Sequence, residues 1–170
     1  MKLLIVVDMQ RDFIDMALGT PEAQAIVPNV IEKINKYKAE GNAVIYTADT
    51  HEEDYLNTIE GQKLPVPHCI KGTDGWKIPE TILQNGKIFE KKTFGCTVLQ
   101  NYIRTNFYDL ESIEVIGLCT DICVISNVML LKAYFPNTSI IVDSSCCAGV
   151  TPESHTRALE AMKMCHIEVI

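Results

Sequence analysis

Apolar residues along the chain recur in two patterns, short continuous runs and longer stretches with helical spacing. A continuous aliphatic run such as LLIVVD (residues 3–8) is typical of a strand that is buried on both faces of a sheet. Stretches with apolar residues three and four positions apart are typical of amphipathic helices. These patterns predict strands at 3–8, 43–49, 87–91, 112–118, 139–143 and 166–170, and helices at 21–40, 97–106, 121–134 and 152–164.

The two kinds of segment alternate along the whole chain. Repeated strand-helix-strand units imply right-handed crossovers and parallel pairing of the strands. No internal repeat or linker interrupts this pattern, so residues 1–170 are predicted to form a single domain. We expect an α/β fold, a three-layer sandwich with a six-stranded, mostly parallel sheet and helices on both faces. Residues 50–86 are polar and rich in Pro and Gly, and a long stretch with little regular structure is usually functional.

The composition and charge of the chain indicate which binding partners and which cellular compartment to expect. A net charge of −7, with no run of Lys or Arg, makes a nucleic-acid partner an unfavourable hypothesis. The first apolar run ends at Asp8 and is too short for a membrane span or a signal peptide. We therefore expect no membrane association and a cytoplasmic location. In that reducing compartment the seven cysteines are expected to be buried side chains, metal ligands or nucleophiles rather than disulfide partners.

Polar residues at the ends of the predicted strands are the candidates for chemistry. Ligands bind at the carboxyl ends of strands in open α/β sheets. No glycine-rich phosphate-binding motif is present, and this favours hydrolytic chemistry over nucleotide binding. The strand-end residues are Asp8, Asp49 with His51, Lys91 with Lys92, the segment Cys119–Cys123, and Asp143.

Cys123 is a candidate nucleophile because it lies just inside a predicted helix that Thr120 or Asp121 is expected to cap. The positive end of a helix favours a thiolate, and its free N–H groups can receive an oxyanion. The alternative is a cysteine that only packs against the sheet. Asp8 is a candidate general base, since a half-buried carboxylate has a raised pKa unless it is paired. Either Lys91 or Lys92 supplies the pairing charge, because alternation lets only one of them face the site.

A second group of residues has the composition of a metal site. Asp49 and His51 lie two residues apart at a strand end, so their side chains project to one side. His68 follows in the long loop, after several carboxylates. Imidazoles with carboxylates suit zinc, manganese or iron. The alternative is a loop with hydrogen-bonded histidines. The remaining histidines and cysteines are expected to be structural, solvated or packing residues, with a redox role left open for the adjacent pair at 146–147: His155, His166, Cys69, Cys96, Cys146, Cys147 and Cys165.

Five segments in a fixed order carry a resemblance to a known family. They are VDMQRDF (7–13), DTH (49–51), PHCIKGTDG (67–75), EKKTFGC (90–96) and GLCTDICV (117–124). Together they resemble the isochorismatase-like cysteine hydrolases and, within them, the nicotinamidase (pyrazinamidase) branch. The resemblance extends from the first strand to about residue 149.

The resemblance implies roles for particular residues. Asp8, Lys91 and Cys123 match a catalytic triad; Lys91 is preferred to Lys92 because Phe94 follows three residues later. The family also has a cis peptide before the residue that matches Cys119, which aims the N–H groups of Cys119 and Cys123 at an oxyanion. The implied metal ligands are Asp49, His51 and His68, with Glu60 as an additional carboxylate, and Phe13 matches a residue that lines the ring pocket.

The function implied by the resemblance is hydrolysis of nicotinamide to nicotinate and ammonia through a cysteine thioester, within NAD salvage. One divalent metal ion is expected as cofactor, with zinc favoured over manganese and iron. Pro65 stands where nicotinamidases often have an aromatic residue, and Trp76 is the candidate to replace it in substrate binding. Two alternatives remain: another small-amide or ureido hydrolase of the superfamily, and a silent metal-binding or redox module. A homo-oligomer, dimer or tetramer, is also expected.

Overall fold

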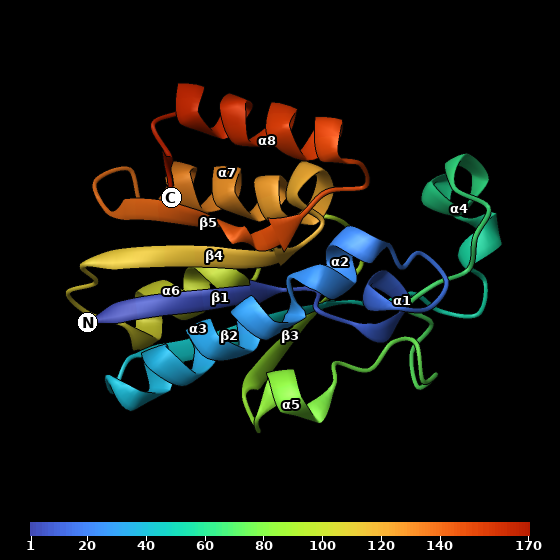
Figure 1. The fold of residues 1–170 in the computed structure, drawn as a ribbon, viewed down its shortest axis with the longest axis horizontal. Helices are drawn as coiled ribbons and strands as arrows, with labels where there is room; N and C mark the ends of the chain where they lie inside the picture. Colours follow the sequence, from blue (N-terminus) through green and yellow to red (C-terminus); the bar gives the residue numbers. More distant parts are fainter.

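The computed structural model describes residues 1–170, and a parallel sheet with strand order β3-β2-β1-β4-β5-β6 forms its centre (Figure 1). Every pair of neighbouring strands is parallel. The predicted α/β class with a six-stranded sheet is therefore confirmed. The strands are β1 (Lys2–Val7), β2 (Ala43–Asp49), β3 (Lys87–Lys91), β4 (Ser112–Leu118), β5 (Ser139–Ala148) and β6 (Glu168–Val169).

The central position of β1 explains its uninterrupted aliphatic sequence. Leu3 to Val7 are fully buried because helices cover both faces of the sheet. The chain pairs β2 on one side of β1 and β4 on the other. The strand order thus reverses beside β1, and the carboxyl ends of β1 and β4 are where a sheet of this kind offers a ligand site.

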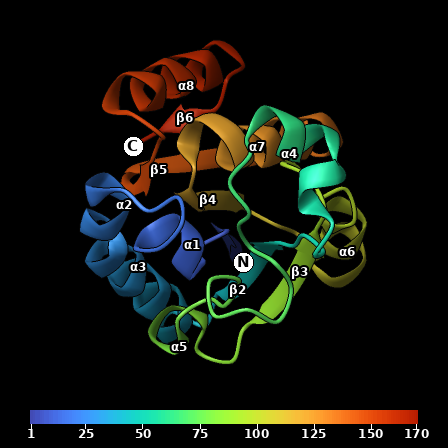
Figure 2. The ribbon, with the colours of Figure 1, turned by 90° about the vertical axis from the view of Figure 1, so that its right-hand side faces the viewer.

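Helices form a layer on each face of the sheet, as the end-on view shows (Figure 2). This arrangement confirms the predicted three-layer sandwich. One layer contains α2 (Pro21–Ala25), α3 (Val27–Ala39) and the short α5 (Glu80–Leu83); the other contains α6 (Leu99–Asn106), α7 (Ile125–Tyr134) and α8 (Pro152–Met164).

The helix predicted over 21–40 is two helices, α2 and α3, separated at Ile26. Pro28 has no N–H to donate to the carbonyl of Gln24, so a continuous helix would lose that hydrogen bond. Proline suits the first turn of a helix, and α3 therefore begins anew at Val27. The side chain of Thr20 caps α2 by accepting a hydrogen bond from the N–H of Ala23 at 3.0 Å.

Other boundaries also differ from the sequence prediction. β5 continues beyond Asp143 to Ala148, while β6 is limited to Glu168–Val169. The helix expected from residue 97 begins at Leu99. The helix expected over 121–134 starts with a π-helical turn, Thr120–Val124, before α7. These differences lie at element ends, where the hydrophobic pattern carries least information.

The segment between β2 and β3 contains more regular structure than its composition predicts. It includes a 3₁₀ turn (Tyr55–Asn57), α4 (Ile59–Lys63) and α5, and a further short helix, α1 (Arg11–Ile14), follows β1. Figure 1 shows α1 and α4 beyond the carboxyl ends of the strands, with α4 projecting from the body of the molecule. This segment therefore covers the predicted site. None of the helices has both the length and the apolar character that a membrane crossing requires.

Candidate functional site

The sheet brings the candidate residues of four strands to one place. Asp8 follows β1, Asp49 and Lys91 end β2 and β3, and Cys123 lies in the turn after β4. Asp49 and Lys91 are direct partners in the β2–β3 register. The predicted strand-end cluster therefore forms beside the point where the strand order reverses.

Lys91 is the centre of this cluster. Its Nζ lies 2.7 Å from Oδ2 of Asp8 and 3.0 Å from Oδ1 of Asp49. The same Nζ lies 3.4 Å from Sγ of Cys123. Lys91 is buried, whereas Lys92 is exposed, as strand alternation requires of neighbours. Burial acts to lower the pKa of Lys91, but the attraction of the Asp8 and Asp49 carboxylates raises it, so its ammonium is charged.

Asp8 is completely buried, more than the sequence suggested, and both of its oxygens are engaged. The hydroxyl of Thr47 donates to Oδ1 at 2.7 Å, and Lys91 pairs with Oδ2. Its backbone has a positive φ of 46° and its N–H donates to the carbonyl of Thr47 at 3.2 Å. Burial raises the pKa of Asp8, and the charge of Lys91 opposes that rise without cancelling it. A carboxylate in this state binds a proton more readily than a solvated one, as a general base and acid must.

Cys123 is buried beside Asp8 and Lys91, and it is a thiol in the resting site. Burial raises the pKa of Cys123 well above its usual value, and the charge of Asp8 adds to the rise. Lys91 acts in the opposite direction but does not outweigh these two effects. The expectation that the helix end would favour a thiolate is therefore wrong, because desolvation of the sulfur is the larger effect. Removal of the proton needs an adjacent base, and the carboxylate of Asp8 is the neighbouring group that could accept it.

The turn that carries Cys123 has the backbone features that the resemblance implied. The peptide bond between Leu118 and Cys119 is cis. The carbonyl of Cys119 accepts hydrogen bonds from the N–H groups of Ile122 at 3.1 Å and Val124 at 3.0 Å, which closes the turn. Its own N–H donates no hydrogen bond within the chain. That N–H remains available for a ligand oxygen.

Neither Thr120 nor Asp121 caps the helix, contrary to the sequence prediction. Cys119 occupies the capping position and makes no side-chain cap. The hydroxyl of Thr120 contacts Nδ1 of His155, and the carboxylate of Asp121 accepts from the N–H of Val150. Both side chains therefore bond to the segment around the start of α8 and not to the N–H groups of their own helix.

The predicted metal ligands converge on one point. One ligand atom from each of Asp49, His51, Glu60 and His68 lies within 4.8 Å of the others. Nε2 of His51 is 2.9 Å from Oδ2 of Asp49 and 3.6 Å from Oε1 of Glu60. Nε2 of His68 is 3.7 Å and 3.8 Å from the same two oxygens. Glu60 is supplied by α4, so this carboxylate is brought in by a helix that the sequence analysis did not predict.

The four residues fit a divalent metal ion. Nδ1 of His68 lies 2.8 Å from the carbonyl of Val66, and this contact directs Nε2 toward the cluster. The ring of Phe13 lies 5.4 Å from that of His68, and Tyr55 packs against both histidines. Two imidazoles and two carboxylates are a ligand set that suits zinc, manganese and iron.

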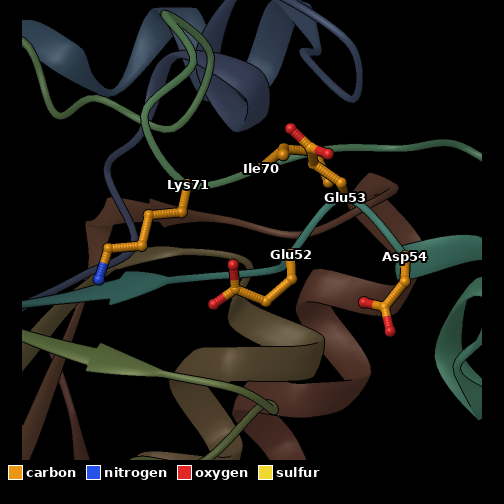
Figure 3. Close-up of a pocket in the computed structure, with 5 residues that line it drawn as sticks. All are labelled: Glu52, Glu53, Asp54, Ile70 and Lys71. Carbon is orange, nitrogen blue, oxygen red and sulfur yellow. The ribbon is translucent and has the colours of Figure 1, made fainter.

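A separate acidic hollow next to His51 does not have this convergence. Glu52, Glu53, Asp54, Ile70 and Lys71 line a hollow of about 500 Å³. Its three carboxylates point in different directions (Figure 3). The convergent metal ligands are those of the neighbouring cluster.

Trp76 is tied to the site by hydrogen bonds. Its ring N–H donates to the hydroxyl of Thr50 at 2.9 Å, and its carbonyl accepts from the side chain of Gln10 at 2.8 Å. The tryptophan is half-buried, while Pro65 is exposed. No ring of the metal cluster stacks on Trp76, so its role in substrate binding remains a prediction.

The structure adds two positioning residues that sequence reasoning missed. The amide of Gln10 donates to the carbonyl of Asp49 at 2.8 Å and accepts from the N–H of Asp49 at 2.7 Å. Oδ2 of Asp12 accepts from the N–H of Cys69 at 2.7 Å, next to His68. Both residues belong to the VDMQRDF segment, and buried polar residues directly after a strand were the signal that could have identified them.

The remaining cysteines and histidines mostly follow expectation. Cys69, Cys96, Cys146 and Cys147 are buried. Cys165 is exposed, so its prediction as a packing residue is wrong; it lies just past the end of α8, where the chain turns toward β6. His166 is also exposed, with a positive φ of 60°.

Comparison with known proteins identifies relatives of the whole chain. A nicotinamidase/pyrazinamidase from Mycobacterium tuberculosis is 26% identical over 187 residues, covering 100% of this chain and 98% of that protein. A protein from Arabidopsis thaliana described as a probable inactive nicotinamidase is 28% identical over 174 residues, covering 94% and 87%. The crystal structure of a pyrazinamidase from Pyrococcus horikoshii in complex with zinc has a TM-score of 0.83 at 28% identity, covering 99% and 98%.

The family assignment rests on a match over nearly the full length. A family model described as the isochorismatase domain matches residues 2–170. The relatives and the solved structure agree with it in extent and in fold. This protein therefore belongs to the isochorismatase family.

Proposed function

We propose that this protein is a metal-containing cysteine amidohydrolase that converts nicotinamide and water to nicotinate and ammonia. The observation that carries the proposal is the position of Lys91, which contacts Asp8, Asp49 and Cys123 in one buried cluster. This arrangement joins a base, a nucleophile and a metal ligand. The nicotinamidase/pyrazinamidase relative and the zinc-containing pyrazinamidase structure support the same activity and cofactor.

The first chemical step uses the raised pKa of Asp8. Asp8 takes the proton from the thiol of Cys123 as the sulfur attacks the amide carbonyl carbon. The ammonium of Lys91 stabilises the negative charge that develops during this step. The S–C bond forms and the carbonyl electron pair moves to oxygen. The N–H groups of Cys119 and Cys123 receive that oxyanion.

The second half of the reaction returns the proton. Asp8 donates it to the amide nitrogen, the C–N bond breaks, and ammonia leaves a thioester on Cys123. Water then attacks the thioester with Asp8 again as the base, and the acid is released as the thiol reforms. The carboxylate of Asp8 therefore accepts each proton that leaves sulfur or water.

Asp49, His51, Glu60 and His68 are the residues that would hold the metal ion. When bound, a divalent ion supplies a point for orienting the ring nitrogen of the substrate. Phe13 lies against His68 and offers an apolar surface for a flat ring.

Two observations keep alternatives in view. The exposed Pro65 stands where an aromatic residue is often found, and this favours a test of other small amides and ureido compounds. The Arabidopsis relative is described as probably inactive, so a silent metal-binding module is a second alternative. The buried contacts of Lys91 with both Asp8 and Cys123 favour catalysis over that alternative.

The test is release of ammonia from nicotinamide by the purified protein, loaded with zinc, manganese or iron, and after chelation. Cys123→Ala is the control for the nucleophile. Metal-dependent release that disappears in Cys123→Ala supports the proposal. A folded, metal-loaded protein that releases no ammonia from nicotinamide contradicts it, and release from another amide under those conditions identifies the alternative hydrolase.

A further inference from the structure

His155, in the first turns of α8, contacts the turn that carries Cys123. Its Nδ1 lies 2.8 Å from the hydroxyl oxygen of Thr120. Thr120 is completely buried, and His155 is the only hydrogen-bond partner of its hydroxyl. Because Thr120 directly follows Cys119, this contact ties the cysteine turn to a separate element of the fold.

The start of α8 is well suited to hold a side chain in place. Thr151 and Ser154 form a reciprocal capping box, with both side-chain-to-backbone distances at 3.1 Å. A Cβ added to Gly149 would lie 2.8 Å from the nitrogen of His155, so the end of β5 and the helix are in direct backbone contact. Figure 1 shows α8 starting beside the carboxyl ends of the strands.

A second contact joins the same two regions. The carboxylate of Asp121 accepts from the N–H of Val150 at 3.2 Å and 3.3 Å. Burial lowers the pKa of His155, and the charge of Asp121 only partly opposes this. The imidazole is therefore neutral at neutral pH, and its Nδ1 can accept the proton of the Thr120 hydroxyl.

We propose that His155 is a positioning residue for amide hydrolysis: it holds Thr120, and through Thr120 the N–H groups of Cys119 and Cys123 that receive the oxyanion. This inference rests on the proposed function. During attack on the carbonyl, S–C bond formation moves an electron pair to oxygen, and the donors must meet that oxygen at about 2.7–3.1 Å. Misplacement of reacting groups by about 1 Å can cost about 100-fold in rate.

The test compares four variants with the metal-loaded wild-type enzyme. We expect His155→Ala to lower kcat by about 10- to 100-fold with KM nearly unchanged, since the oxyanion donors act mainly in the transition state. His155→Asn should restore most of kcat, because its Oδ1 can occupy the place of Nδ1. Thr120→Val should resemble His155→Ala, and the double variant should be no slower than either, because both changes remove the same contact.

Thr156→Ala is the matched control. Its hydroxyl bonds only to the carbonyl of Pro152 on the exposed side of α8, so kcat should stay at the wild-type level. A His155→Ala variant that loses kcat only in proportion to its unfolded fraction would overturn the inference. A rise in KM at constant kcat, or no rescue by His155→Asn, would do the same.

A second readout separates this inference from the choice of substrate. Acetylation of Cys123 by p-nitrophenyl acetate exchanges an ester for a thioester with release of p-nitrophenol, and it needs the oxyanion donors but no pyridine pocket. If wild type is acetylated but does not hydrolyse nicotinamide, the proposed substrate fails and the inference is still tested. Slower acetylation of folded His155→Ala or Thr120→Val supports it, and acetylation at the wild-type rate refutes it. No acetylation of the wild-type protein refutes both.

Discussion

The molecule contains two lysines, one buried and one half-buried, that each lie between two carboxylates and near a cysteine. Lys91 pairs with Asp8 and Asp49 beside Cys123. In the second cluster, Nζ of Lys33, from α3, lies 2.7 Å from Glu114 and 2.7 Å from Asp143. The thiol of Cys146 lies 3.7 Å from the same oxygen of Asp143. The two clusters have nearly the same composition, so composition alone does not distinguish a reactive site from a structural one.

The difference lies in how the remaining positions around each group are filled. In the Lys33 cluster, Tyr37 donates to Glu114 at 2.5 Å, and Ser145 donates to Asp143 through both N–H and hydroxyl. Although burial acts to raise it, the hydrogen bond from Lys33 holds the pKa of Asp143 below its usual value.

The cysteines of the two clusters also differ in their surroundings. Cys146 lies within β5, in the stretch between Val142 and Cys147 where the pairing with β4 shifts register, and burial raises its pKa to about 11. Cys123 instead lies in a turn beyond the end of β4, beside Asp8, whose pKa is raised. The same turn contains the N–H of Cys119, which donates no hydrogen bond within the chain. A base that can gain a proton and an N–H that can bind oxygen are what the Lys33 cluster lacks.

The largest expected effect comes from the two cysteines. Cys123→Ala should lower turnover by at least about 10³-fold, since it removes the sulfur that forms the thioester in the proposed mechanism. Cys146→Ala should leave kcat and KM near their wild-type values. Steady-state ammonia release from both variants measures this. Comparable losses in the two variants would erase the distinction between the clusters.

The lysines should separate activity from stability. Lys91→Met should lower kcat by about 100-fold or more, because neither the base nor the nucleophile keeps its cation. It should also lower the free energy of unfolding by about 3–5 kcal/mol, since it leaves two buried carboxylates unpaired. Lys33→Met should lower stability while kcat is retained. Urea denaturation and kinetics on the same samples provide the comparison, and a Lys33→Met enzyme that folds fully but is inactive would contradict it.

The aspartates are expected to change stability in opposite directions. Because the folded pKa of Asp143 is depressed, its stabilisation is present above the unfolded pKa of about 3.9 and is lost as pH falls through the folded pKa. Because the folded pKa of Asp8 is raised, its ionised form disfavours folding above that same unfolded pKa. Asp143→Asn should thus be less stable than wild type at pH 7, with the gap closing at acid pH. Asp8→Asn should be inactive and more stable at pH 7.

A smaller effect concerns the four candidate metal ligands, which adjoin the Lys91 cluster through Asp49. Zinc should raise the Tm of wild type, because binding to the folded state stabilises it. Glu60→Gln should weaken zinc affinity by about tenfold and reduce that rise, since it replaces one of two carboxylate ligands. Glu53→Gln, in the divergent acidic hollow, is the matched control and should respond like wild type. An equal loss of zinc affinity in both variants would show that the negative charge of the whole region, and not the convergence of four ligand atoms, holds the ion.

The sequence predicted those parts of the site that depend on strand ends. Alternation allowed only one of Lys91 and Lys92 to face the site, and the family pattern with an aromatic residue at 94 favoured Lys91, which is the buried one. The D-x-H spacing correctly placed Asp49 and His51 on one side. These inferences succeed because a parallel sheet gathers the carboxyl ends of its strands at one edge.

What the sequence did not predict depends on contacts between distant segments. The resting state of Cys123 depends on how completely other elements bury it, and the hydrogen bonds of Thr120 and Asp121 depend on where α8 begins. The break before Pro28 is different, because the missing N–H was visible in the sequence and the helical periodicity concealed it.

The amide of Gln10 limits which residues can occupy its position. It meets both the N–H and the carbonyl of Asp49, as a backbone peptide unit would, and so prolongs the hydrogen-bond ladder of β2 past the end of β1. Glutamate offers no donor to the carbonyl, leucine offers neither group, and asparagine is shorter by one methylene. Mutational tolerance at position 10 should therefore be nearly absent, although Gln10 touches no reacting atom. In a saturation-mutagenesis library, substitutions of Gln10 should be depleted as strongly as substitutions of a catalytic residue.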